Sequence, residues 1–112
     1  MPDLRRVGRA AEDRAAEYLI GKGYTIVTRR FAIRGGEIDL VALDGDTIVF
    51  VEVKAHMAKP YVPEEALSSA KAESLRRAAL KYLEQVAEPD RRYRFDFIAI
   101  DREGIRHHAD VI

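Results

Sequence analysis

Acidic and basic side chains interrupt two neighbouring segments that otherwise have the composition of β-strands. Glu37 and Asp39 lie in the first segment, and Glu52 and Lys54 lie in the second, with an Asp-Gly-Asp turn at residues 44–46 between them. Strand side chains alternate between the two faces, so residues two apart are expected to point the same way. Each segment should therefore present one charged face.

The turn at residues 44–46 decides how these two faces meet. A two-residue loop that begins at Asp44 would place Glu37 opposite Glu52, whereas a loop beginning one residue later would place Asp39 there. Either register gathers the charged side chains on one face. A three-residue loop would move one strand's side chains to the opposite face.

The chemistry of this group is that of a hard metal ion. Apolar residues surround it, as expected for a central strand pair that is covered on both sides, and buried carboxylates are kept only when they are paired, hydrogen-bonded or bound to metal. Asp39, Glu52 and the carbonyl of Val53 are oxygen ligands suited to Mg²⁺ or Mn²⁺. Lys54 would then orient or deprotonate a water, or neutralise charge on a phosphate. This is the chemistry of phosphodiester hydrolysis; the alternative is an ion-pair network lining a solvated sheet face.

Composition and length exclude some classes of protein but do not identify the function. The chain has 112 residues, which is enough for one domain over residues 1–112. It has no cysteine, which excludes a disulfide framework and a thiolate zinc site. The sequence shows neither a transmembrane run nor an apolar signal segment, so a cytoplasmic protein with no membrane partner is the default expectation. His107 and His108 are expected to be exposed to solvent.

Charge is balanced overall and uneven locally. Nineteen basic and nineteen acidic residues give a formal net charge of +0, which does not indicate nucleic-acid binding by itself. Basic residues nevertheless flank the acidic motif, so local positive charge is placed to meet phosphates. The candidate nucleic-acid contacts are Lys71, Arg30, Arg34 and His56.

Periodicity predicts two helices and five strands. The helices are expected at residues 3–22 and 63–86, the second starting at Pro63, and the strands at 24–30, 36–43, 46–54, 93–100 and 105–111, with the last strand at an edge. A short basic loop is expected between the first two strands.

One charged residue in each helix lies where the helix should face the sheet. Glu12 borders the apolar stripe of the first helix, about 20° from Leu19 at 100° per residue. Lys71 lies within the stripe of the second helix, four residues from both Leu67 and Leu75. Lys71 either extends to solvent, as long lysine side chains can, or reaches the acidic face.

The order helix, three strands, helix, strand, with an acid on the second strand and Glu-x-Lys on the third, resembles the core of the PD-(D/E)XK nuclease superfamily. Asp39, Glu52 and Lys54 match its motif, and Glu12 matches the first-helix glutamate of some members, including archaeal Holliday junction resolvases. The chain is more closely similar to the YraN-type family of predicted endonucleases. That similarity rests on Gly8, Ala11-Glu12, Tyr18-Leu19, Gly23-Tyr24, residues 36–40, residues 50–54, Lys71 and residues 94–96.

The resemblance implies an α/β fold with a restriction-endonuclease-like core: order α-β-β-β-α-β, a short extra C-terminal strand, and a mixed sheet flanked by helices. It implies a Mg²⁺- or Mn²⁺-dependent endonuclease that cleaves DNA, expected to be a structured, repair or recombination intermediate. Asp39, Glu52, the Val53 carbonyl and Glu12 would hold the metal, and Lys54 would complete the catalytic set.

Three questions stay open at the level of sequence. The rival class is a non-catalytic module that binds nucleic acid or a protein on a nuclease fold. RNA is a further candidate substrate, because a phosphodiester site reads no sugar by itself. Cleavage of a four-way junction would require two active sites and hence a homodimer. The chain also departs from the family pattern, with Arg30 where asparagine is usual and His56 where arginine is usual.

Overall fold

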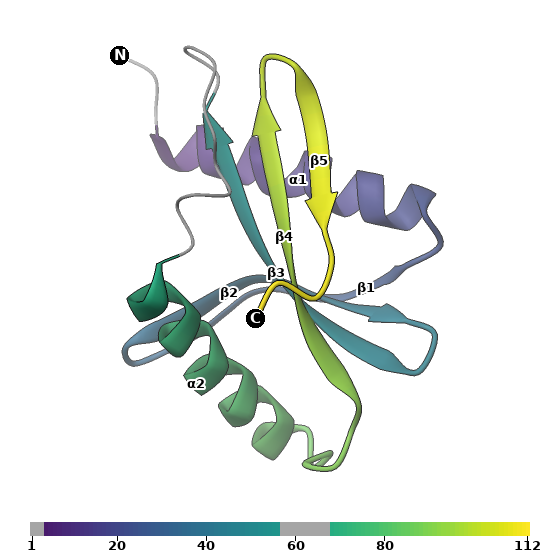
Figure 1. The fold of residues 1–112 in the computed structure, drawn as a ribbon, viewed down its shortest axis with the longest axis vertical. Coiled ribbons are helices and arrows are strands. Elements are labelled where there is room, and N and C mark those ends of the chain that lie inside the picture. Colours follow the sequence, from purple (N-terminus) through teal and green to yellow (C-terminus); the bar gives the residue numbers. More distant parts are fainter. Residues whose placement is uncertain (1–3, 57–67) are drawn as a thin grey trace.

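The computed structural model describes residues 4–56 and 68–112. A helix is followed by three strands, a second helix and two further strands (Figure 1). The elements are α1 (Leu4–Gly21), β1 (Thr25–Ile33), β2 (Gly36–Asp44), β3 (Thr47–His56), α2 (Ser69–Gln85), β4 (Tyr93–Asp101) and β5 (Gly104–His108).

The strands form one sheet in the order β1-β2-β3-β4-β5. β3 and β4 are parallel, and the other neighbours are antiparallel. The chain crosses from β3 to β4 by way of α2, which is the connection that a parallel pair requires. The expected α/β fold is confirmed, with a mixed sheet, the order α-β-β-β-α-β and a short extra strand at the edge.

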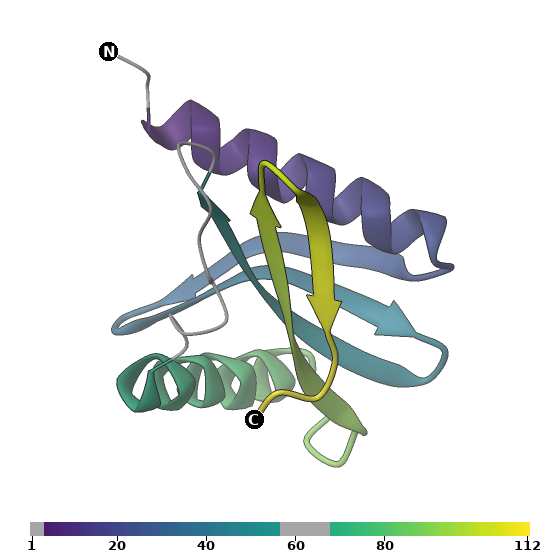
Figure 2. The same cartoon turned by 45° about the horizontal axis from the view of Figure 1, so that its top comes forward.

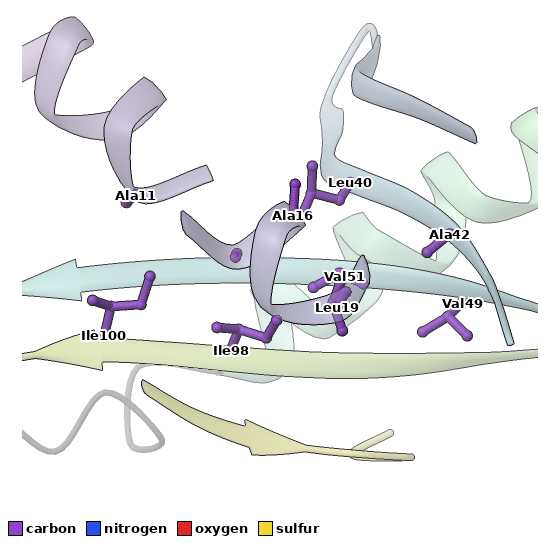
Figure 3. Close-up of a cluster of buried hydrophobic side chains, with 10 residues drawn as sticks. Ala11, Ala16, Leu19, Leu40, Ala42, Val49, Val51, Ile98 and Ile100 are labelled. Carbon is purple, nitrogen blue, oxygen red and sulfur yellow. The ribbon is translucent and has the colours of Figure 1, made fainter. Parts of the chain in front are cut away.

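The helices lie on opposite faces of the sheet, as Figure 2 shows. The core beneath α1 joins its small residues and Leu19 to alternate residues of β2, β3 and β4, among them Leu40 and Val51 (Figure 3). The core beneath α2 contains Ile38, Phe50 and Leu75, with other residues of β2, β3 and α2 and Phe95 of β4. The central strands are therefore buried on both faces, which explains their nearly continuous apolar sequence.

The alternation of side chains breaks in the middle of β2. Ile38 packs in the core beneath α2, whereas Leu40, two residues later, packs in the core beneath α1. On β1, Arg30 has a φ of 55°, a left-handed conformation that is rare for a residue other than glycine. The assumption of strict alternation through Asp39 is therefore wrong, because the pleat is interrupted at that residue.

Several predicted boundaries differ from the observed ones. β1 continues to Ile33, so the expected basic loop reduces to the two-residue turn Arg34-Gly35. α2 starts at Ser69 rather than Pro63, because Ser68 is extended and its side chain accepts from the backbone N–H of Lys71 as an N-cap. The predicted first turn at residues 63–65 lies outside the described residues. β5 ends at His108, three residues earlier than expected.

Gly36 marks the closest approach of β2 to α2. A Cβ added there would lie 2.9 Å from the carbonyl oxygen of Ser74 and 3.3 Å from its hydroxyl oxygen. Gly36→Ala should therefore lower the free energy of unfolding by about 1–3 kcal/mol through overpacking. Urea denaturation of the variant measures this. Gly21→Ala is the control, because a Cβ at Gly21 meets nothing within 4 Å; equal losses in both variants would contradict the expectation.

Candidate active site

The candidate site lies where β2 and β3 cease to pair regularly. The loop between them is Gly45-Asp46, because Asp44 pairs with Thr47, and the pairing continues to Leu40 opposite Val51. This is the second of the two predicted registers, the one that places Asp39 opposite Glu52. Beyond it, the backbone N–H of Val53 donates to Oδ2 of Asp39 at 2.7 Å.

Glu52 is the buried acid of the site. Its side chain is only 4% exposed, and its Oε1 lies 3.1 Å from Nζ of Lys71 and 3.8 Å from Nζ of Lys54. Lys71 therefore reaches the acidic face, which resolves the alternative left open by the sequence. The second oxygen, Oε2, is buried and has no hydrogen-bond partner among the described residues. A buried carboxylate oxygen without a donor needs a cation or a proton nearby.

Asp39 is strongly perturbed by its surroundings. Burial raises the pKa of Asp39 to about 8, and the negative charges of Glu52 and Glu12 act in the same direction. The N–H of Val53 opposes the rise. The surroundings of Asp39 therefore favour its protonated form.

Glu12 comes to the site from α1 and contacts Arg30 on β1. Its Oε1 accepts from Nε of Arg30 at 2.8 Å. This bond and the charges of Glu12, Glu37 and Asp39 raise the pKa of Arg30. Glu12, Asp39 and Arg30 therefore interact electrostatically, and Glu12 has a basic partner that the sequence did not reveal.

The donor set partly fits a divalent cation. Asp39 and Glu52 supply hard oxygens, and in a strand the C=O of a residue points to the same side as its N–H, so the Val53 carbonyl faces Asp39. The orphaned Oε2 of Glu52 is a ligand without a partner in the described part of the chain. Across residues 4–56 and 68–112, however, no group of three or more His, Asp or Glu side chains is close enough to hold a metal.

The remaining predicted site residues differ in their surroundings. Lys54 is half exposed beside Glu52. Arg34 is exposed in the turn between β1 and β2. His56 ends β3 opposite Asp101, and its side chain lies outside the described residues. The basic residues thus approach the acids from β1, β3 and α2.

A second buried polar group lies on the other face of the sheet, beneath α1. Asp96 is fully buried and accepts from Nε of Arg94 at 2.9 Å and from the backbone N–H of Asp110 at 3.0 Å, and its Oδ2 is 2.7 Å from Nε2 of His107. The prediction that His107 is exposed is wrong, since only 3% of its side chain is accessible. The sequence feature that could have revealed this buried group is an aspartate, Asp96, within the mainly apolar strand β4.

Lys22 completes this second group. Its Nζ lies 2.9 Å from Nδ1 of His107. An ammonium group only donates, so Nδ1 accepts and the proton of the neutral imidazole lies on Nε2, which donates to Asp96. This second group links the end of α1 to β4 and β5. Its buried side-chain polar atoms have hydrogen-bond partners within the protein, so its role is to stabilise the fold.

Comparisons with known proteins agree on one family. A model described as "Uncharacterised protein family UPF0102" matches residues 11–100. A UPF0102 protein of Symbiobacterium thermophilum is 44% identical over 98 residues, covering 87% of this chain and 83% of the relative. A UPF0102 protein of Pelotomaculum thermopropionicum is 43% identical over 108 residues, covering 93% of this chain and 90% of the relative. In the described part of the chain, no helix is long and apolar enough to cross a membrane.

Proposed function

The chain belongs to the UPF0102 family, as its YraN-type resemblance predicted, and we propose that it is a divalent-metal-dependent endonuclease that acts on DNA. One observation carries this proposal. Glu52, whose buried Oε2 has no hydrogen-bond partner among the described residues, lies beside Asp39, whose pKa is raised. Perturbed acids that share a site are characteristic of catalytic centres. Membership of the PD-(D/E)XK superfamily is part of the proposal.

The site residues have distinct roles in this proposal. Asp39, Glu52 and the Val53 carbonyl hold Mg²⁺ or Mn²⁺, which supplies Lewis-acid stabilisation of the phosphate and an activated water. Lys54, 3.8 Å from Glu52 and half exposed, orients the attacking water or stabilises negative charge on the phosphate. Lys71 pairs with Glu52 and would contact a phosphate of the substrate.

Cleavage assays test the proposal directly. Labelled duplex, single-stranded, flapped and four-way-junction DNA, with an RNA of matched sequence, would be incubated with the protein in Mg²⁺ or Mn²⁺. Cleavage that needs metal and is lost in Lys54→Ala supports the nuclease. No cleavage of any substrate would overturn it. Preference for the junction would add the prediction that the protein works as a homodimer.

Thermal melting in metal separates the nuclease from the non-catalytic module. Metal that binds the folded protein stabilises it by about 2.7 kcal/mol at 100 times Kd, which raises the Tm by about 10 to 20 °C in a domain of this size. An ion-pair network would show almost no response. Glu52→Gln should remain folded and lose the Tm increase; a wild-type-like increase in that variant would exclude Glu52 as a ligand.

A further inference from the structure

Arg30 has an unusual backbone for its position in a strand. Its φ of 55° lies in the left-handed region, which is strained for a residue other than glycine. Its neighbours Arg29 and Phe31 pair with Leu40 and Ile38, so Arg30 lies opposite Asp39. The strained residue is therefore placed directly beside the candidate metal ligand.

The ion pair with Glu12 does not by itself account for this strain. Exposed ion pairs contribute little to stability. Arg29, the preceding residue, makes the same kind of helix-to-strand pair with Asp13 of α1, and its backbone is not among those with positive φ. A pair between these two elements can thus form without a positive φ, so the ion pair alone does not account for the conformation of Arg30.

The contact leaves one part of the guanidinium available. Nε of Arg30 donates to Glu12, whose side chain is only 12% exposed, while the side chain of Arg30 is 44% exposed. Glu12 is thus committed to Arg30, and the outer edge of the guanidinium faces solvent beside Asp39. A guanidinium held at one nitrogen keeps the planar fork that binds two phosphate oxygens.

We propose, on the basis of the proposed nuclease function, that Arg30 binds a backbone phosphate of the substrate and that Glu12 is the positioning residue that holds Arg30, rather than a metal ligand. Metal binding then depends on Asp39, Glu52 and the Val53 carbonyl alone. This assignment agrees with the absence of a three-acid cluster within residues 4–56 and 68–112.

Two measurements separate a positioning role of Glu12 from a metal-ligand role. DNA affinity is measured by fluorescence anisotropy in Ca²⁺, an oxygen-binding cation like Mg²⁺, with the labelled DNA that the wild type cleaves. Metal affinity is measured from the rise in Tm during a Mg²⁺ titration without DNA. The variants are Glu12→Gln, Arg30→Asn and the double variant, and the matched controls are Asp13→Asn and Arg29→Asn.

Arg30→Asn should weaken DNA binding about 10-fold and reduce the slope of log affinity against log salt by about 1, as expected for one lost phosphate contact. It should remain folded, since asparagine adopts positive φ more readily than arginine does. Glu12→Gln should also weaken DNA binding, although it removes a negative charge, and should leave the Mg²⁺ affinity within about twofold. The double variant should be no weaker than Arg30→Asn, since the two residues act together.

Three results would overturn the inference. Tighter DNA binding by Glu12→Gln would show that Glu12 only repels phosphate. A loss of Mg²⁺ affinity in that variant would make Glu12 a metal ligand. Equal effects of Arg29→Asn and Arg30→Asn would make the contact nonspecific. In each case a wild type that still cleaves DNA in metal leaves the proposed function intact, whereas a wild type that neither cleaves nor binds metal removes both.

Discussion

Asp39→Asn should abolish metal-dependent cleavage while making the metal-free protein more stable. The amide removes the charge of the proposed metal ligand but keeps an oxygen that can accept from the N–H of Val53, as Oδ2 does at 2.7 Å. Loss of a group that only supports a metal ligand costs about 10- to 100-fold, so loss of the ligand itself should lower kcat/KM by at least about 10³-fold.

The gain in stability follows from the direction of the pKa shift. Burial and the charge of Glu52 raise the pKa of Asp39 to about 8, from 3.8, so the folded protein favours the protonated carboxyl. Ionisation of Asp39 therefore costs stability progressively as the pH rises from about 4 to about 8. Asp39→Asn has no such cost, and its advantage over the wild type should grow across this range and level off above it.

Melting curves of both proteins between pH 4 and pH 9, in EDTA and in Mg²⁺, measure these effects. In EDTA at pH 8 the variant should be more stable than the wild type, because it has no buried carboxyl group to ionise. In Mg²⁺ the order should reverse, because only the wild type binds the ion. Asp13→Asn, on the exposed surface of α1, should show neither effect. A variant that is less stable than the wild type at pH 8 in EDTA would contradict the buried-charge account.

The sequence predicted the acids of the site because of their residue types. Asp39, Glu52 and Lys54 stand out where strands should be apolar, and local spacing was enough to place them on adjacent strands. The local sequence could not decide between the two strand registers, because both loops contain Gly45 and both are compatible with a tight turn. Packing of the whole β2–β3 pair between two helices selects one of them.

Two features of the structure depend on contacts that no local pattern reveals. The left-handed conformation of Arg30 occurs without a glycine that could have signalled it. The interruption of the pleat at Asp39, opposite Arg30, was therefore not expected. The contact of His107 with Lys22 spans 85 positions of sequence. Two adjacent histidines near a chain end look like surface residues, and only the closing of β5 against β4 makes one of them buried.

The largest loss of stability is expected for Asp96→Asn. Asp96 lies opposite Val51, on the face of the sheet covered by α1, and its side chain is fully buried. Burial alone would raise its pKa, but hydrogen bonds from His107, Arg94 and Asp110 together lower the pKa of Asp96. An asparagine would direct its NH₂ group at one of these donors.

Breaking a buried pair by removing one partner costs about 3–5 kcal/mol, so the Tm of Asp96→Asn should fall by at least about 12 °C in a domain of this size. Chemical denaturation at pH 7 measures the change. Asp44→Asn is the matched control. It removes a carboxylate that contacts the same arginine at 3.0 Å but has a side chain that is 46% exposed, so its cost should stay below about 1 kcal/mol.

The pH dependence distinguishes loss of this carboxylate from a simple packing defect. Because the folded pKa of Asp96 is lowered below 3.8, its contribution is complete above about pH 4 and is lost as the pH falls through the folded value. The gap between the wild type and Asp96→Asn should therefore narrow in acid, whereas a packing defect would keep it constant. Since Glu52 pairs with Phe97 and lies on the opposite face, the folded variant should bind Mg²⁺ as the wild type does. Loss of metal binding in the folded variant would show that the two polar groups are coupled through β3 and β4.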